Sequence, residues 1–401
     1  MQQATDELCA QLSDLEFIDS PGYLPFCPAT SPRYQHIQLS PTPRFLFRVW
    51  SPNSDGQTDS IWIDSRDAAA KLGSAAEDLF QTSDVAATAA EIANHLWWRR
   101  GDRADNLVSW TSSLLFAIQY MIYRRRLESD GSDLDEIMLC ILDTSDYPAG
   151  TFACDMDLIK AFYAESEDLQ KLHRMRTGGI YYYGEYLSQG SIKIEGKCKI
   201  VSAQAMLDCG LASLWASFDP EFEGENRWAK AVVQIRQSLL CSETSSDDID
   251  DEQADIAVRI AELFGSRWRL PMAVNLLALL PGQLQAASIG GILIGKGGYK
   301  DDDFRICALV NVQTSDEMPE VCRVQKIWLL IHELRSRRKT EELLREAISS
   351  VRRASMYVHG IADLTDEDRS KWLELVQQVQ FMSLSLEQSI GEVPRVEQWR
   401  M

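Results

Sequence analysis

Residues 106–117 read Asn-Leu-Val-Ser-Trp-Thr-Ser-Ser-Leu-Leu-Phe-Ala, and this stretch decides the predicted fold. Its first half is a short β-prone run, and its second half opens the sequence of residues 114–128, which predicts a helix. Alternation along the strand places Ser109 and Thr111 on one face, where a half-buried strand normally carries apolar side chains. These hydroxyls either bind a ligand or orient other site residues. The alternative role for Ser112, or for Ser113 beside it, is to cap the following helix.

Two further apolar runs each carry one charged side chain. Arg48 lies in RFLFRVW, residues 44–50, and Glu185 lies in YYYGEYLSQGSI, residues 181–192. A cation in an apolar strand needs an anionic partner, which is either a ligand or a carboxylate such as Asp64 or Asp67. Glu185 is either a partly desolvated carboxylate that binds a sugar hydroxyl or acts as a base, or an edge-strand residue that faces solvent.

The order of predicted elements indicates an α+β protein with a mixed β core, followed by a mainly helical region. Alternating apolar residues predict a strand around residues 44–50, a continuous apolar run predicts a buried strand within residues 136–148, and helical periodicity runs through residues 68–80 and 85–100. Thr340 and Thr365 each precede acidic residues, and both predict helix starts. We divide the chain into four parts: a proline-rich N-terminal extension (1–40), an α+β domain (41–240), an acidic linker (241–256) and a helical C-terminal region (257–401).

Composition limits the classes of function. The chain has 401 residues with 40 basic and 60 acidic side chains, so the net charge of −20 disfavours binding to DNA and limits any RNA contact to local basic patches. Nine scattered cysteines without a Cys-x-x-Cys pair indicate a reducing compartment and no zinc site. With no secretory signal or membrane-spanning run recognised, we expect a cytoplasmic protein that binds neither membrane nor metal.

The succession of Arg48, the cluster of Ser109, Thr111 and Ser112, and Glu185 resembles the Arg, Ser-Thr-Ser, Glu signature of the ADP-ribosyltransferase fold. The resemblance implies that these residues surround an adenosine-type ribose, with NAD as the cofactor of that activity. Enzymes of the family usually carry Gln or Glu two positions before the catalytic glutamate, where this chain has Tyr183. We include Tyr183 among the substrate-binding candidates, together with Trp50, which follows Arg48 by two residues.

Residues 40–215 also resemble a family of filamentous-fungal proteins. The segments that show this resemblance are RFLFRVW, HLWWRRGD, LDTSDYPAGTFACD and YYYGEYLSQGSIKIEGKC. This resemblance suggests the fungal arginine-containing cyclodipeptide synthases, which join arginine from arginyl-tRNA to a second amino acid without a separate cofactor. It implies that Glu185, Ser109 and Arg48 act on the aminoacylated ribose at the tRNA 3′ end. Recognition of the arginine side chain needs carboxylates, for which Asp143 and Asp146 are candidates.

Three hypotheses follow from these patterns. The first is a cytoplasmic aminoacyltransferase that makes a cyclic arginine-containing dipeptide in fungal secondary metabolism from arginyl-tRNA and a second amino acid or aminoacyl-tRNA. An NAD-dependent ADP-ribosyltransferase or NAD glycohydrolase is the second. The third is a non-enzymatic interaction protein that uses its helical C-terminal half as a binding surface.

Overall fold

The computed structural model describes residues 22–99, 101, 104–126, 130–177, 182–222, 228–242, 247–300, 303–304, 318–359 and 365–391. The first half of the predicted N-terminal extension, residues 1–21, lies outside these residues. Contacts divide the chain into two units. The first comprises Met1–Gln283 with Leu309–Val324, and the second comprises Leu284–Ala308 with Gln325–Met401. The acidic stretch predicted as a linker lies within the first unit.

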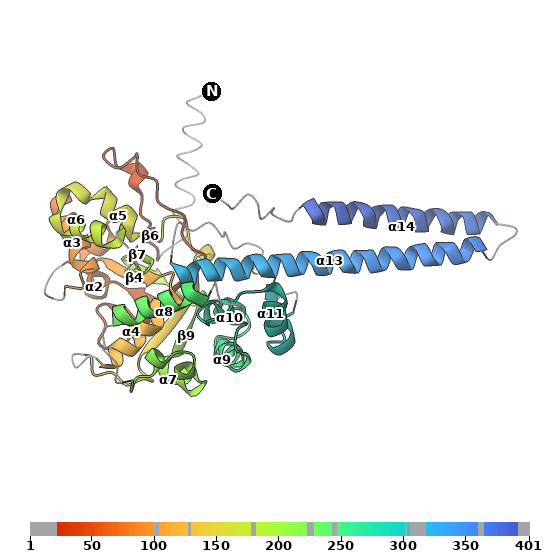
Figure 1. Ribbon diagram of the computed structural model, residues 1–401. Helices are drawn as coiled ribbons and strands as arrows, with labels where there is room; N and C mark the ends of the chain where they lie inside the picture. The colour runs from red at the N-terminus through yellow and green to blue at the C-terminus, as the bar shows by residue number, and fades with distance from the viewer. Residues whose placement is uncertain are drawn as a thin grey trace, which may run out of the picture. The chain divides into compact units, whose positions relative to one another are not determined.

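A six-stranded antiparallel sheet forms the centre of the first unit (Figure 1). Its strands lie in the order β6-β7-β4-β1-β5-β9. Counted along the chain, this spatial order is 4-5-2-1-3-6. The strands are β1 (Phe45–Trp50), β4 (Leu107–Thr111), β5 (Met138–Asp143), β6 (Ala153–Cys154), β7 (Glu185–Gln189) and β9 (Cys198–Ser202).

The predicted apolar runs form the central strands because both faces of the sheet are covered. Leu46, Val108 and Leu142 belong to one buried cluster with aromatic and β-branched neighbours. Leu107 and Leu187 belong to a second cluster, which contains side chains from the helices α3 (Val85–Leu96), α5 (Asp155–Ala161) and α6 (Glu167–Thr177). Burying apolar side chains on both sides explains why these strands read as almost continuous apolar sequence.

The two central strands β1 and β4 pair over a very short distance. Their register contains one pair, Phe47 opposite Thr111, whereas β1 pairs with β5 along its whole length from Phe45 to Trp50. The strands therefore separate beyond this point. Separation exposes the edge of each strand to the space between them, and side chains of both strands line a pocket there.

Helices and a small second sheet complete the first unit. The sheet has the order β2-β3-β8, formed by β2 (Gln57–Thr58), β3 (Trp62–Asp64) and β8 (Ser191–Lys193). The helices are α2 (Arg66–Ala69), α3 (Val85–Leu96), α4 (Leu114–Arg126), α5 (Asp155–Ala161), α6 (Glu167–Thr177), α7 (Ala203–Asp208), α8 (Trp228–Ser242), α9 (Asp251–Glu262) and α10 (Arg269–Ala278). Helix α4 packs against β1 and α8 (Figure 1).

Local sequence explains several helix boundaries. Asp84 caps α3 by accepting a hydrogen bond from the backbone of Ala87, and Asp250 caps α9 in the same way. The helical periodicity of residues 68–80 does not produce one helix. Its α-helical part ends at Ala69, because Lys71 takes a left-handed conformation with φ of 57° and a 3₁₀ turn follows from Gly73.

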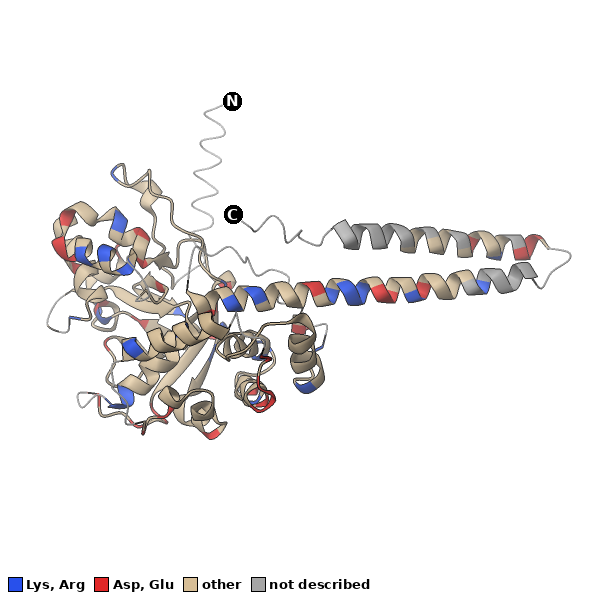
Figure 2. Cartoon of the chain, in the orientation of Figure 1, with Lys and Arg blue, Asp and Glu red and all other residues tan. Residues whose placement is uncertain are grey.

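The second unit contains α11 (Ala286–Gly290), a π-helical turn (Gly291–Lys296), most of α13 (Pro319–His359) and α14 (Asp366–Gly391). The predicted helix start at Thr340 is wrong, since α13 continues through it for 41 residues in total. At Thr365 the prediction is confirmed, because its hydroxyl accepts from the backbone of Asp368 at 3.3 Å. Acidic and basic side chains are interspersed along α13 (Figure 2). Among the helices in the described ranges, none has both the length and the apolar character of a membrane span.

Candidate active site

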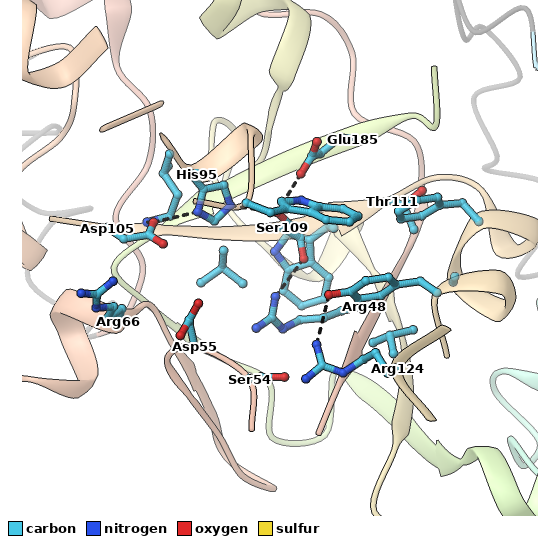
Figure 3. Close-up of a pocket in the computed structure, with 18 of the residues that line it drawn as sticks. Arg48, Ser54, Asp55, Arg66, His95, Asp105, Ser109, Thr111, Arg124 and Glu185 are labelled. Carbon is cyan, nitrogen blue, oxygen red and sulfur yellow. Dashed lines mark hydrogen bonds and ion pairs between the residues drawn. The ribbon is translucent and has the colours of Figure 1, made fainter. Parts of the chain in front are cut away.

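A pocket of about 320 Å³ lies in the first unit, between the separating strands (Figure 3). Its wall includes Arg48 of β1, Ser109 of β4 and Glu185, the first residue of β7. Three residues predicted from separate segments therefore line one pocket, on three adjacent strands of the sheet. Helix α3 contributes His95, and the loop before β4 contributes Asp105.

Ser109 lies at one end of a chain of hydrogen-bonded polar groups. Its Oγ is 2.8 Å from Nε2 of His95, and Nδ1 of the same imidazole is 2.7 Å from Oδ1 of Asp105. When Nδ1 carries the proton and donates it to Asp105, Nε2 is an acceptor that faces the serine hydroxyl. The arrangement has the connectivity of an activated serine: a hydroxyl, a base, and a carboxylate that orients the base.

The electrostatic environment favours the charged form of this histidine. Burial acts to lower the pKa of His95, but the charge of Asp105, its hydrogen bond and the charge of Glu185 outweigh burial, so the pKa is raised above its ordinary value. For Asp105, burial acts to raise the pKa, and the pairing with His95 and a backbone hydrogen bond from Leu107 bring it below its ordinary value. The two side chains thus stabilise each other as an ion pair.

Glu185 connects the serine to a buried ion-pair network. Oε1 of Glu185 accepts a hydrogen bond from the Ser109 hydroxyl at 2.7 Å, and Oε2 accepts from Nη2 of Arg176 at 2.8 Å. Arg176 of α6 also pairs with Asp155 at the start of α5. These three charged side chains are 0–3% exposed. The alternative of a solvent-facing edge glutamate is therefore wrong.

Arg48 lies in the pocket without a carboxylate partner among the described residues. Its Nη1 donates to the backbone oxygen of Ser109 at 3.0 Å, and its Nε is buried with no hydrogen-bond acceptor in the same part of the chain. Desolvation lowers the pKa of Arg48 to about 10. The predicted alternative, a salt bridge with Asp64 or Asp67, is not formed. A partly buried cation in this setting favours an anionic ligand.

Three further predicted residues lie beside the pocket. Thr111 lines it, and its hydroxyl donates to the backbone oxygen of Tyr183 at 2.6 Å. Ser112 is buried and its backbone bonds to Gly184, so these residues hold the segment that leads into β7. Tyr183 stacks on Phe116 with ring centroids 4.4 Å apart, and its hydroxyl accepts from Arg176.

The remaining three predicted residues do not line this pocket. Trp50 belongs to the buried core. Asp143 is 2% exposed and pairs with Arg44 at 3.0 Å, and Asp146 pairs with Arg267. Because partners within the chain neutralise both carboxylates, they have structural roles in the described state. The pocket has a different exposed acid, Asp55, which forms no ion pair within the described residues (Figure 3).

Sequence reasoning missed His95, Asp105 and Arg176 as site residues. His95 precedes the WW pair by two positions in an amphipathic helix, and no local motif connects it to Ser109. A search for a nucleophile and a base close in sequence also fails, because 14 residues separate the two. The available signal was the presence of one histidine and two aspartates, Asp102 and Asp105, on the segment that leads into β4.

Fold and site together define an α+β protein with a serine, histidine and aspartate constellation in a pocket of an antiparallel sheet. The family model of a domain of unknown function, DUF7587, matches residues 41–201, which include Arg48, His95, Ser109 and Glu185. No curated protein and no solved structure shows a significant match to the chain.

Proposed function

We propose that this protein is an aminoacyltransferase of the cyclodipeptide synthase class, which takes arginine from arginyl-tRNA and joins it to a second aminoacyl group. The observation that carries the proposal is the contact of Ser109 Oγ with His95 Nε2 at 2.8 Å, in a pocket where Asp105 orients the imidazole. Acyl transfer through serine requires such a base. The resemblance described above supplies the identity of the acyl group.

The first step transfers the arginyl group to the protein. Ser109 Oγ attacks the ester carbonyl carbon of arginyl-tRNA, and its proton passes to Nε2 of His95. The bond between that carbon and the ribose oxygen breaks, and the ribose oxygen takes the proton from His95. The products are an arginyl ester of Ser109 and a tRNA with a free 3′ end.

Formation of the cyclic product requires a second ester. The cyclic dipeptide contains two amide bonds. If the second amino acid also arrives as an aminoacyl-tRNA, each of these amide bonds replaces one ester bond. The α-amine of the arginyl ester attacks that second ester and releases the second tRNA. The new α-amine then attacks the Ser109 ester, the carbon–Oγ bond breaks, and the amine proton returns to Oγ through His95. No oxidant or external energy source is needed.

Other pocket residues fit supporting roles in this reaction. Arg48 is a cation without a carboxylate partner among the described residues, and it suits the phosphate at the tRNA 3′ end. Asp55 is a pocket acid without an ion-pair partner in the same set of residues, and it suits the guanidinium of the substrate arginine. We assign this role to Asp55 instead of Asp143 and Asp146, which are paired elsewhere. Glu185, bonded to Ser109, suits a ribose hydroxyl or a reacting amine.

The charge distribution restricts how tRNA is bound. Two groups of basic residues lie close together in the sequence, at 99–103 and 124–126, and in them Arg99 pairs with Asp168 at 2.6 Å and Arg124 pairs with Asp130 at 2.5 Å. Arg100 and Arg103 lie outside the described residues. Such pairing and the net charge of −20 favour recognition of the 3′ end over broad contact with the phosphate backbone.

A second candidate function is NAD-dependent ADP-ribosyl transfer or NAD hydrolysis. It is favoured by the positions of Arg48, Ser109 and Glu185 on adjacent strands and by the 2.7 Å bond between the last two. Against it, the ring of Tyr183 is stacked on Phe116, at the position where the ADP-ribosyltransferase family usually carries an acceptor-selecting Gln or Glu. Nicotinamide release from NAD, with Glu185→Gln as control, tests this candidate.

The test of the proposed function is product analysis in a heterologous host. Extracts of cells that express the wild-type chain, Ser109→Ala or Ser238→Ala are searched by mass spectrometry for cyclic dipeptides that contain arginine. Ser238 is an exposed serine on α8 and serves as the matched control. We expect product with the wild type and Ser238→Ala and none with Ser109→Ala. Absence of product from folded wild-type protein contradicts the proposal.

A further inference from the structure

A second pocket, of about 360 Å³, shares part of its wall with the first. Trp98 and Phe116 line both. Trp98 stacks on Trp228 of α8 with centroids 5.5 Å apart, and Phe116 stacks on Tyr183 at 4.4 Å. The second pocket is therefore walled by aromatic rings on the side nearest the reactive serine pocket.

The positive charge in the wall of this second pocket, on Arg236, is already neutralised by a carboxylate of the chain. Arg236 is its one charged lining residue among those described, and it is buried. Nη2 of Arg236 lies 2.6 Å from Oε1 of Glu320, its Nε lies 3.0 Å from Oε2, and Nη1 donates to the backbone oxygen of Tyr182 at 2.6 Å. Ser113 donates to the same carboxylate at 2.7 Å. A ligand anion is thus not required to satisfy the cation.

One residue in the wall that the two pockets share, Trp98, has a strained backbone. Trp98 has φ of 53°, a left-handed conformation that is uncommon for a bulky residue. Its side chain is 39% exposed even though it is a tryptophan with three aromatic neighbours. Strained residues persist where the surrounding structure holds them in place, and they concentrate at ligand-binding sites.

We infer that the second pocket receives the side chain of the second aminoacyl group and that it selects a large, uncharged, apolar side chain. This inference rests on the proposed function. Flat rings such as Trp228 and Tyr183 favour stacking with aromatic groups, and Val232 adds an aliphatic surface. A second arginine or lysine is disfavoured here because the described lining contains no carboxylate, and the neighbouring Glu320 is already paired with Arg236. The two pockets would thus separate a cationic side chain from an apolar one.

Substitutions on α8 test the inference without touching the serine site. Ala229→Phe fills the pocket, and Ser238→Ala on the same helix is the control. Purified protein is given arginyl-tRNA with an equimolar mixture of phenylalanyl-, leucyl-, alanyl-, glutamyl- and lysyl-tRNA, and the cyclic products are quantified. We expect phenylalanyl or leucyl products from the wild type. Ala229→Phe should lower them by at least about tenfold relative to the alanyl product.

Two further readouts separate failure of the inference from failure of the proposed function. The rate of arginyl transfer to Ser109 should be unchanged in Ala229→Phe. Saturation-transfer NMR should detect binding of N-acetylphenylalaninamide, but not N-acetyllysinamide, to the wild type, with the signal lost in Ala229→Phe. Normal arginyl transfer with an unchanged product distribution, or with a charged second residue, overturns the inference alone. Absence of arginyl transfer in the wild type overturns the proposed function, and the pocket assignment with it.

Discussion

Nε2 of His95 lies 2.8 Å from Oγ of Ser109, although the two residues belong to a surface helix and a central strand. The contact exists because β4 separates from β1 after a single register pair, which leaves Ser109 accessible from α3. The same hydroxyl donates to Oε1 of Glu185 at 2.7 Å. The serine therefore has two titratable groups within hydrogen-bond distance, the Glu185 carboxylate and an imidazole that accepts a proton only in its neutral form.

Replacing the imidazole should abolish most activity and preserve the fold. His95→Gln removes the base from Ser109, and general-base assistance contributes about 100- to 10 000-fold in enzymes. We expect arginyl transfer to fall within that range. The measurement is single-turnover transfer from labelled arginyl-tRNA, with circular dichroism to check folding. His173→Gln, on the outer helix α6, is the matched control. Wild-type rates in His95→Gln would exclude the imidazole as the base.

The pH dependence should report the raised pKa of His95. Only the neutral imidazole accepts a proton, so the rate of arginyl transfer should increase as pH rises through that pKa. Its inflection should lie above 6.5, the ordinary value for histidine. In Asp105→Asn the stabilising charge is absent, burial has a larger net effect, and the inflection should move to lower pH. The same inflection in both proteins would contradict the assigned roles.

Arg176 should be essential for stability. It compensates two buried carboxylates, Asp155 and Glu185, and its removal leaves both without their cation. Breaking a buried ion pair in this way costs about 3–5 kcal/mol. We expect Arg176→Met to lower the free energy of unfolding by that amount in urea titrations. Arg174→Met, at an exposed position of the same helix, should change it by less than about 0.5 kcal/mol.

Substitution of Arg48 should impair substrate binding without loss of stability, whereas substitution of Arg176 should reduce stability. Its charge is desolvated and has no carboxylate partner among the described residues, so Arg48→Met should leave the urea midpoint unchanged or raise it. The same substitution removes the group that we assign to the substrate phosphate. We expect KM for arginyl-tRNA to rise by more than about tenfold, as loss of a charged hydrogen bond implies. Strong destabilisation with an unchanged KM would identify Arg48 as structural.

Much of the sheet could be predicted from sequence because its strands are buried on both faces. The apolar runs around Phe47 and Ile141 form two buried strands that pair with each other, which is the environment that their sequence predicts. Helix boundaries were harder to predict from the sequence. Thr340 and Thr365 have similar capping chemistry, yet only Thr365 begins a helix, since capping residues also occur within a helix that is stabilised elsewhere along its length.

The site residues that could be predicted from the sequence are polar residues that lie in apolar strands. Arg48, Ser109 and Glu185 are polar residues in apolar strands, and the structure brings them to one pocket. His95 and Asp105 lie in segments where polar residues are ordinary, so only three-dimensional proximity reveals them. Asp143 was predicted as a site residue for a related reason, and it does not line the pocket. Its position at the end of a buried strand resembles a site, but Arg44 neutralises it.

The covalent intermediate offers the most direct test of the central claim. Purified protein is mixed with arginyl-tRNA, quenched in acid within seconds, and analysed by intact-protein mass spectrometry followed by peptide mapping. We predict a mass increase of one arginyl residue, located on Ser109, labile to hydroxylamine and absent from Ser109→Ala. Protein that makes a cyclic arginine dipeptide without any acylation of Ser109, or that acylates a different residue, would contradict the account.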